Sequence, residues 1–437
     1  FILINIIFSS AVGVIASSKK ELQESLDFND KEFGTFTSIT ATGRIIGTFI
    51  YMGLLALDIR KTLTIVCLLM SVSEFAAFMI IKNKILLFAV RFLIGFSRNY
   101  FQIYVPVYHD QFGVKPLKTL LMSIGNITSP LGRVLGFTIG TFNGPTNWER
   151  SLFYVGLLLL AVGAIIFVSP PRYFSGRATF VGYFNKDEDN KLEKERSKGG
   201  RYSDSIFEMG EIKVKKKGGI VLSEVLGILK NKTFMFSTFT RASVSFIFDI
   251  SHLFIKDYVN NGLKFEDPQL ILAYYAPASV IGPSLGGFIG GAIITAVGGY
   301  EHKGSCKYIQ IFSVLTFISV IGVILSSRIY TFAISLFLFY TTAYMFYPII
   351  TGYAVNALSA KQKGTGYSFT ILICTLFGNL PGPLYYGVLN DLFKKTDPKF
   401  AWRASFGYYI IGFILLQFAC RNRYRDLEEK EKKNKDD

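Results

Sequence analysis

Residues 151–167 read SLFYVGLLLLAVGAIIF, an uninterrupted apolar run without a single charged side chain. A helix that crosses about 30 Å of hydrocarbon needs about 20 mostly apolar residues. With its flanking residues this run approaches that length, and it is too apolar for an ordinary helix in a soluble core. The stretch therefore predicts a membrane-spanning helix.

Similar runs recur on both sides of this one, and the composition agrees with them. The chain is 50% hydrophobic and only 18% charged, with a mean hydropathy of +0.37, whereas soluble proteins are about a quarter charged. We predict an all-α integral membrane protein with about twelve transmembrane helices in two six-helix bundles. Because the chain begins at Phe1, we expect further sequence before a clipped first span. The expected spans are 1–18, 33–57, 62–82, 85–108, 118–142, 148–168, 231–256, 269–298, 305–326, 329–357, 361–390 and 401–420.

Polar segments divide the spans into domains. The prediction is an N-terminal bundle (1–168), a linker (169–229), a C-terminal bundle (230–420) and a charged tail (421–437). The linker carries KDEDNKLEKERSKGG and KVKKKGG, and its end, GIVLSEVLGILK, has the apolar spacing of a helix on the membrane face. An even number of spans in each half places linker and tail on one side. Their basic residues indicate that this side is cytoplasmic.

The net charge of +16 does not indicate nucleic-acid binding, because the basic residues gather in segments that flank membrane spans. The partner it indicates is the lipid bilayer. The four cysteines lie in spans or at their edges without CxxC spacing, so neither a disulfide framework nor a metal site is expected. We find no nucleotide-binding loop and no catalytic triad, and we therefore predict no cofactor and no enzymatic activity.

The two halves resemble each other. TNWERSLFYVGLLLL (146–160) precedes span six, and KFAWRASFGYYIIGF (399–413) precedes span twelve, with a Trp and an Arg where each span begins. The loop GLLALDIRKTL (53–63) resembles the signature of the Major Facilitator Superfamily, whose fold consists of two parallel six-span repeats. Asp58, Arg60 and Lys61 match the charged core of that signature. In the family this loop latches neighbouring helix ends, which implies a conformational role for these three residues. The alternative is an ordinary charged turn.

Span four, RFLIGFSRNYFQIYVPVYHDQF (91–112), resembles the Spinster-like branch of that family through Arg91 and Gly95. The branch usually carries Gly-Glu where this chain has Ser97 and Arg98, and an Asp-Arg pair in span one, where residues 1–18 have no charge. The resemblance implies a secondary or facilitative transporter that works by alternating access. The departures motivate an alternative, namely a transport-inactive relative that serves as a structural subunit and binds partner subunits.

Charges inside the predicted spans suggest the substrate. A charge at the bilayer centre costs from about 2.5 to more than 10 kcal/mol, so it persists where it faces water, protein or a partner. The acids are too few to pair every arginine, although a structural pair such as Arg241 with Asp249 remains an alternative for any one of them. We therefore predict a small anionic solute, either organic or lipid-like. The candidate binding residues are Arg98, Arg44, Arg133, Arg91 and Arg241, with Tyr344 and Asn379 from spans ten and eleven.

Three titratable residues are candidates for proton coupling. Glu74 lies in span three, and Asp249 and His252 lie at i and i+3 on one face of span seven. Histidine titrates near neutral pH, so the pair would form a proton relay. The alternative, which we favour, is that His252 lies near the outer end of its span and extends toward the membrane surface.

Small residues and prolines indicate where helices pack or break. Gly282, Gly286 and Gly290 form a GxxxGxxxG row in span eight, which we expect to approach the glycine-rich span five closely and to slide during gating. Static packing of these helices is the alternative, and the sequence does not separate the two. In FGNLPGPLYYG (377–387), Pro381 and Pro383 predict a break in span eleven, and broken helices line the central cavity of transporters.

Overall fold

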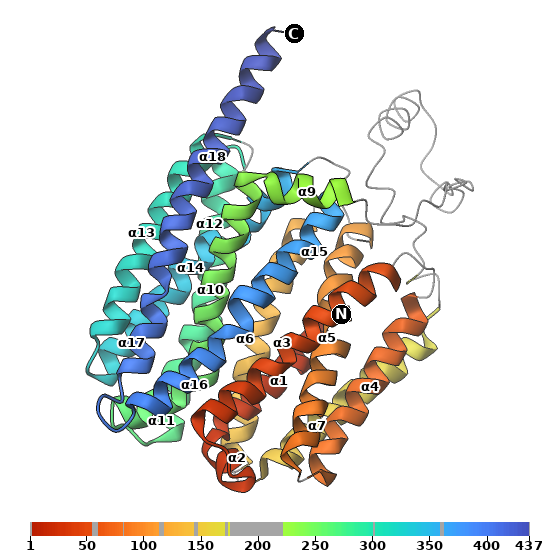
Figure 1. Ribbon diagram of the computed structural model, residues 1–437, viewed down its shortest axis with the longest axis vertical. Coiled ribbons are helices and arrows are strands. Elements are labelled where there is room, and N and C mark those ends of the chain that lie inside the picture. Colours follow the sequence, from red (N-terminus) through yellow and green to blue (C-terminus); the bar gives the residue numbers. More distant parts are fainter. Residues whose placement is uncertain are drawn as a thin grey trace.

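The structure is a computed structural model that describes residues 2–54, 60–81, 83–112, 118–143, 147–170, 174, 222–299, 302–358 and 362–436. The regular structure in these ranges is entirely helical (Figure 1), as predicted. The helices before the linker are α1 (Ile2–Ser17), α2 (Lys19–Leu26), α3 (Asp30–Leu54), α4 (Arg60–Ile80), α5 (Lys84–Phe112), α6 (Lys118–Phe142) and α7 (Trp148–Val168). Those after it are α9 (Leu222–Lys230), α10 (Lys232–Asp257), η5 (Tyr258–Gly262), α11 (Pro268–Ala276), η6 (Pro277–Ile281), α12 (Gly282–Ala296), α13 (Gly304–Leu325), α14 (Ile329–Asn356), α15 (Lys363–Cys374), η8 (Thr375–Asn379), α16 (Pro381–Phe393), α17 (Phe400–Gly407) and α18 (Tyr409–Asp436).

Seven helical stretches in the described ranges are long and apolar enough to cross a membrane, and α1 with α2, bent by 72°, makes an eighth. The helices α3, α5, α6 and α10 have 25 to 29 residues and belong to the same bundle. They carry the intramembrane arginines and fall short of that apolarity. The seven stretches are Arg60–Ile80, Trp148–Val168, Pro268–Ala296, Gly304–Leu325, Ile329–Ala354, Thr365–Phe393 and Phe400–Glu429.

Glycines bring two pairs of helices into backbone contact in the first half. A Cβ at Gly136 of α6 would lie 1.8 Å from the carbonyl oxygen of Ser10 in α1. A Cβ at Gly95 of α5 would lie 1.9 Å from the carbonyl oxygen of Thr40 in α3. Only glycine permits such approach, and close backbone packing is a main source of helix association in lipid.

The second half repeats these two contacts. A Cβ at Gly378 of η8 would lie 2.6 Å from the carbonyl oxygen of Ala242 in α10, and one at Gly286 of α12 would lie 2.0 Å from that of Thr341 in α14. The first half therefore joins span one to span five and span two to span four, while the second joins seven to eleven and eight to ten. This correspondence is the contact pattern of a repeated six-span unit.

The glycine row of span eight does not face span five. Gly286 meets α14, and a Cβ at Gly290 would lie 2.2 Å from the carbonyl oxygen of Met345 in the same helix. Gly282 also lies against α14, beside Tyr340. Our prediction of a sliding contact between spans five and eight is wrong at these glycines, because their small face is used for packing inside one half.

Span eleven contains a π-helical turn instead of the full break that we predicted. The amide of Leu380 donates to the carbonyl of Thr375 at 2.8 Å, and α16 begins at Pro381 directly after the turn. Pro381 and Pro383 lie in the first turn of α16, where backbone N–H groups have no partner within the helix in any case. The π turn therefore accommodates the two prolines without interrupting the helix, and residues Thr365–Phe393 remain one span.

Both segments outside the bundle contain helix. α9 confirms the helix predicted at the end of the linker and lies at the linker end of the bundle (Figure 1). The charged tail continues α18 as a helix that projects from the same end (Figure 1). Lys432 and Glu428, one turn apart, form an ion pair at 3.4 Å that supports this exposed helix. Most of the predicted linker 169–229 lies outside the described residues.

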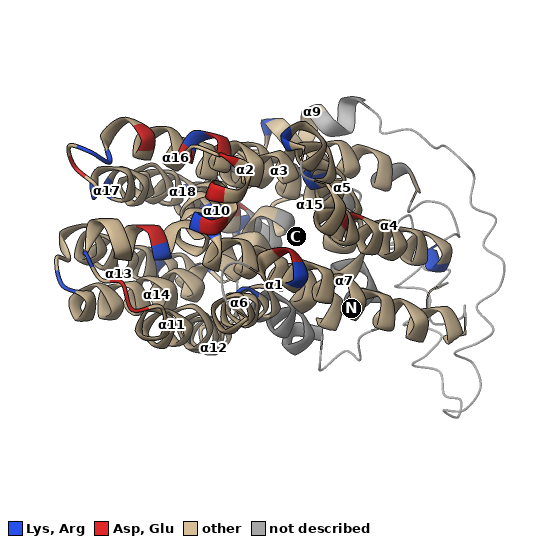
Figure 2. Cartoon of the chain, turned by 90° about the horizontal axis from the view of Figure 1, so that it is seen from below, with Lys and Arg blue, Asp and Glu red and all other residues tan. Residues whose placement is uncertain are grey.

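In the part of the chain that the structure describes, the main contacts between the two halves come from three pairs of spans. α3 packs along α16, α1 packs against α10, and α6 contacts α11 and η6. Charged residues are sparse along the helices and gather where α2, α10 and α16 meet (Figure 2). This charged junction lies at the end of the bundle away from α9 and the C-terminus (Figure 1).

Candidate functional site

Four charged residues from four helices interact electrostatically near the middle of their helices. Arg44 is near the middle of α3, Arg98 of α5, Arg133 of α6 and Asp249 of α10, and their charges interact across the boundary between the halves. We call these four residues the central cluster. Arg91 of α5 also acts on Arg44 and Arg98, so the structure brings four of the five predicted arginines near one another.

Arg98 has no acidic partner in the described part of the chain. Its Nη2 donates to the Ser9 hydroxyl of α1 at 3.0 Å, and its guanidinium lies 6.0 Å from the centre of the Phe8 ring. Its Nε is buried without a hydrogen bond. The side chain of Arg44, within the same described ranges, makes neither a hydrogen bond nor an ion pair, while its backbone carbonyl accepts from the Thr48 hydroxyl. Both residues are partly exposed.

Asp249 joins the halves. Arg133 Nη2 lies 3.1 Å from Asp249 Oδ1, and the two side chains are 16% and 15% exposed. Asn379, in the π turn of span eleven, donates its Nδ2 to Asp249 Oδ2 at 2.6 Å. The structural pair that we considered, Arg241 with Asp249, is not the one that forms. The partner of Asp249 comes from the other half.

Arg241 lies instead against aromatic side chains of the second half. Its Nε donates to the Tyr347 hydroxyl at 3.3 Å, and its guanidinium lies 5.2 Å from the centre of that ring. Tyr344 stacks on Phe248, with centroids 5.0 Å apart and an angle of 20° between the rings. Tyr344 is 7% exposed, so its ring serves mainly in packing, beside the central cluster.

Arg91 and Glu74 lie inside the first half. Arg91 is 3% exposed, donates its Nε to the Phe36 carbonyl at 3.4 Å, and lies over the Phe36 ring. Glu74 is 5% exposed and accepts a hydrogen bond from the Ser97 hydroxyl at 3.0 Å. Neither side chain faces the second half.

His252 is buried in the second half, and our preferred interpretation of it is wrong. Only 2% of the residue is exposed, so it does not extend to the membrane surface. Its Nδ1 is hydrogen-bonded to the Tyr275 hydroxyl at 2.6 Å, and its ring stacks on Tyr340. Asp249 bonds Arg133 and Asn379 and not His252, so the structure does not contain the predicted relay pair.

The loop after span two joins neighbouring helix ends. Lys61 donates its Nζ to the carbonyls of Phe167 and Ser169 at 2.8 and 2.6 Å, at the C-terminus of α7. The dipole of a helix favours a cation at that end. The carbonyl of Arg60 accepts a hydrogen bond from Tyr100 of α5 at 3.0 Å. Asp58 lies outside the described residues.

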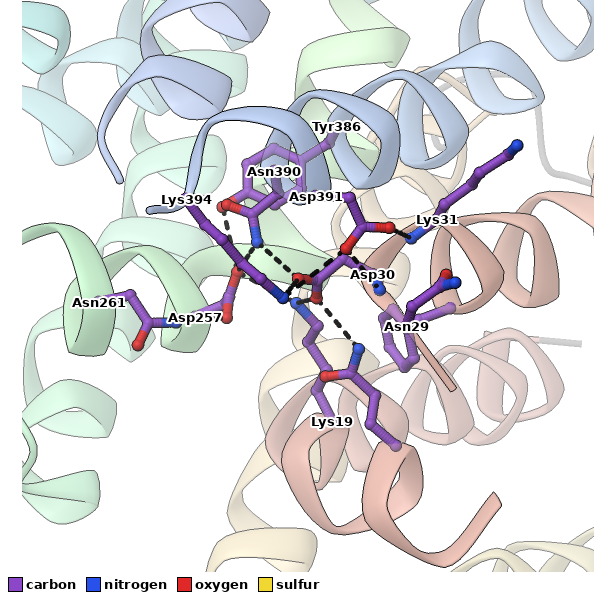
Figure 3. A network of polar contacts seen from close by, with 12 residues as sticks. Lys19, Asn29, Asp30, Lys31, Asp257, Asn261, Tyr386, Asn390, Asp391 and Lys394 are labelled. Carbon is purple, nitrogen blue, oxygen red and sulfur yellow. Dashed lines mark hydrogen bonds and ion pairs between the residues drawn. The ribbon is translucent and has the colours of Figure 1, made fainter. Parts of the chain in front are cut away.

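A second polar network lies where α2, α10 and α16 meet, at the end of the bundle away from α9 (Figures 1 and 3). Lys19, at the start of α2, lies 2.8 Å from Asp30 Oδ1 and 3.0 Å from Asp257 Oδ2. Lys394, after the end of α16, lies 2.9 Å from Asp30 Oδ2. Asn390 donates to both carboxylates, at 3.1 and 3.2 Å. We call these five residues the end network; it holds α2 and α3 against α10 and α16.

Asp391 reinforces this closure. Its carboxylate accepts hydrogen bonds from the backbone amides of Asp30 and Lys31, at 3.1 and 2.7 Å (Figure 3). These amides begin α3, where the helix dipole and the free N–H groups favour an anion. The cap of a helix in the first half is thus supplied by the second half. The backbones also touch, because a Cβ at Gly387 would lie 2.4 Å from the Asp30 carbonyl oxygen.

Each carboxylate of the end network lies beside a lysine of opposite charge. Asp30 precedes the span predicted at 33–57. Its burial alone would raise its pKa, but the charge of Lys19 and hydrogen bonds from Lys19 and Lys394 bring the pKa well below the usual range. The hydrogen bond to Asp30 raises the pKa of Lys394. Each group is therefore held in its charged form by its partner.

Sequence reasoning missed the end network. Its members are ordinary charged or amide residues near span ends, up to 375 positions apart, and nothing in their local sequence pairs Lys19 with Lys394 through Asp30. The available signal was the boundary position of each charge, which does not specify a partner. In the described ranges, no group of His, Cys, Asp and Glu is arranged to hold a metal ion.

Comparison with known proteins identifies the family. Residues 1–383 match the profile of the Major Facilitator Superfamily, which is most of the 437-residue chain. The chain belongs to this superfamily. It is a multi-pass membrane transporter that works by alternating access and not an enzyme, so the family resemblance of its sequence is confirmed.

Solved structures show the same fold across nearly the whole chain. A bacterial homologue of the human lysosomal transporter Spinster, inward-facing and unoccupied, matches with a TM-score of 0.71 at 13% identity, covering 97% of this chain and 96% of that one. A D-xylose–proton symporter matches with a TM-score of 0.64 at 11% identity, covering 97% and 95%. The sugar transporter ERD6-like 16 of Arabidopsis thaliana is 25% identical over 171 residues, which is 38% of this chain and 35% of that relative.

Proposed function

We propose that this transporter carries a small organic or lipid-like anion, which binds at the central cluster. The observation that supports this most is Arg98, a guanidinium at mid-depth whose single hydrogen bond in the described ranges goes to a serine hydroxyl. Arginine donates two parallel hydrogen bonds to carboxylate or phosphate oxygens, and such charge-assisted pairs are strong. Arg44 adds a second cation that has no acidic partner in the described ranges. Arg133 forms an ion pair with Asp249.

The arrangement of the site supports alternating access around it. The central cluster takes Arg44, Arg98 and Arg133 from the first half and Asp249 from the second, and Asn379 adds an amide from the second half. The end network and Asp391 close the halves on the side away from the linker. We place the linker and the tail in the cytoplasm, so that this closed end faces the opposite compartment. Because span four resembles the Spinster-like branch, we propose that the chain is related to that branch.

Arg98 provides the test. The purified protein, reconstituted in liposomes, is assayed for uptake of labelled carboxylates and organic phosphates. Arg98→Gln should abolish uptake of any anion that the parent carries, because the fork and the charge are both lost. Arg98→Lys should restore little, because an ammonium cannot make the two parallel bonds.

The matched control is Arg328→Gln, at an exposed arginine in the loop before α14. It should leave uptake unchanged. Parent-like uptake by both Arg98 variants would contradict an anion site at this residue. Failure of the parent to move any anion, with folded protein in the membrane, would contradict the anionic substrate.

A further inference from the structure

We propose that Glu74 of α4, with Ser71 of the same helix and Ser97 of α5, binds one Na⁺ ion inside the first half. The site lies apart from the central cluster and does not depend on what the transporter carries. Glu74 belongs to a helix that is long and apolar enough to cross the membrane, and only 5% of the residue is exposed. Its carboxylate therefore has to be neutralised inside the bundle.

The chain supplies no cation to Glu74. In the part of the chain that the structure describes, no basic side chain forms an ion pair with it. The titratable side chains on which its charge acts are those of Tyr51 and Cys67, whose hydroxyl and thiol are hydrogen-bonded to each other at 3.4 Å. Burying an ionised carboxylate without a partner is too costly. Either a proton or a metal ion must therefore neutralise Glu74.

The two oxygens of this carboxyl group differ in their contacts. Oε2 accepts a hydrogen bond from the Ser97 hydroxyl at 3.0 Å, whereas Oε1 is buried and has no hydrogen-bond partner. A proton on Oε2 would leave Oε1 without a partner, and a proton on Oε1 would have no acceptor. Buried polar atoms are rarely left in this way. A metal ion bound by both oxygens satisfies the whole group.

The two serine hydroxyls complete a set of four oxygens. Ser71 and Ser97 are fully buried, and their Oγ atoms lie 2.9 Å apart. Ser71 Oγ also lies 2.9 Å from the Cys67 carbonyl oxygen. Ser97 Oγ lies 3.2 Å from the Ile94 carbonyl oxygen. When each hydroxyl donates its proton to the carbonyl of its own helix, the lone pairs of both oxygens can bind a cation.

The charge and the spacing of this set select Na⁺. A single carboxylate balances a single positive charge, so a divalent ion would leave one charge uncompensated. Carboxylate and hydroxyl oxygens are hard ligands, which do not favour the softer transition metals. Na⁺ is close in size to Ca²⁺, whose oxygen ligands lie at about 2.3–2.6 Å. Neighbouring oxygens 2.9 and 3.0 Å apart therefore suit Na⁺ better than the larger K⁺.

The position of the site makes the ion a resident of the fold and not a transported ion. All three residues belong to α4 and α5, which pack mainly on helices of the first half. Alternating access rocks one bundle against the other largely as rigid bodies, so it does not open a site inside one bundle. The ion joins α4 to α5 at Ser97, directly before Arg98, and thereby stabilises the helix that carries this arginine.

The experiment measures the melting temperature of the purified protein in sodium, potassium or choline chloride, at equal ionic strength and neutral pH. Saturating Na⁺ should raise the melting temperature by about 4 °C, because it binds the folded state, whereas K⁺ and choline should not. Glu74→Gln keeps the size of the side chain and removes the charge. It should abolish both this response and the binding of radiolabelled Na⁺. The matched control is Glu266→Gln, at an exposed acid before α11, which should respond as the parent does.

Ser71→Ala keeps the carboxylate and provides the test if Glu74→Gln does not fold. It removes one ligand oxygen, so half-maximal stabilisation should need at least about tenfold more Na⁺. Equal melting temperatures of the parent in the three salts would overturn the inference, and stability that then increases as the pH falls would assign the neutralising cation as a proton. A Na⁺ response that survives in Glu74→Gln would also overturn it. Anion uptake tests the proposed function separately, so the failure of one proposal is distinguishable from the failure of the other.

Discussion

Lys19→Met should open the end of the transporter that the end network holds closed. Lys19 is 4% exposed and lies between the carboxylates of Asp30 and Asp257, and it also lies over the rings of Phe33 and Phe254. Methionine keeps the apolar stem of the side chain and removes the charge. The two carboxylates then face each other across the closed interface without their shared cation, whereas in the open state water solvates both.

The structure supports an estimate of the effect. Removing one partner of a buried ion pair costs about 3–5 kcal/mol. Asp30 keeps Lys394 at 2.9 Å and Gln23 at 3.0 Å, so the loss lies below this range, at about 2 kcal/mol. This changes the ratio of open to closed molecules about 30-fold. A parent that is open at this end in about 1% of molecules would become open in about a quarter of them.

Spin labels report the change directly. Glu24→Cys in α2 and Lys395→Cys after α16 place labels at exposed positions on the two halves, and the natural cysteines are buried. Pulsed distance measurements should show a longer-distance population that grows in Lys19→Met. The matched control is Lys31→Met, because the side chain of Lys31 is exposed and points away from the network (Figure 3). An unchanged distance distribution in a folded Lys19→Met protein would refute the assignment of Lys19 as the residue that holds this end closed.

Three further predictions use the same labels or the folded yield. Gly387→Leu should keep the labelled end open, because its Cβ would lie 2.4 Å from the Asp30 carbonyl oxygen; a parent-like closed distance would contradict this. Gly286→Leu should lower the melting temperature and folded yield, since α12 packs on α14 there, whereas Gly287→Leu, which has open space, should not; equal stability of the two variants would show that the contact is unimportant. The Asp30–Lys394 pair should stay closed from about pH 5 to 9. Because the pKa of Asp30 is lowered, the stabilisation that Asp30 gives to the closed end is fully present at every pH above the usual pKa of an aspartate. Because the pKa of Lys394 is raised, its stabilisation is fully present at every pH below the usual pKa of a lysine. Opening near pH 6 would refute this.

The positions of the spans and the presence of the internal arginines follow from the sequence alone. Apolar runs such as 151–167 have one stable solution in a bilayer, a helix that satisfies its own backbone hydrogen bonds. A charge in such a run is visible without any knowledge of the fold, so Arg44, Arg98 and Arg133 stood out. The family was also recognisable from the loop at residues 53–63, because a sequence motif can be read along the chain without knowledge of the fold.

Partners across the bundle were decided by the tertiary structure alone. Asp249 pairs with Arg133, 116 positions away, and not with Arg241 on its own helix. The glycines of span eight pack inside their half, while Gly387 packs against the other half. Helical periodicity tells which residues share a face, but the neighbour of that face depends on how the helices are arranged around one another. That arrangement arises from backbone contacts and charge pairs between residues far apart in the chain, which no local pattern records.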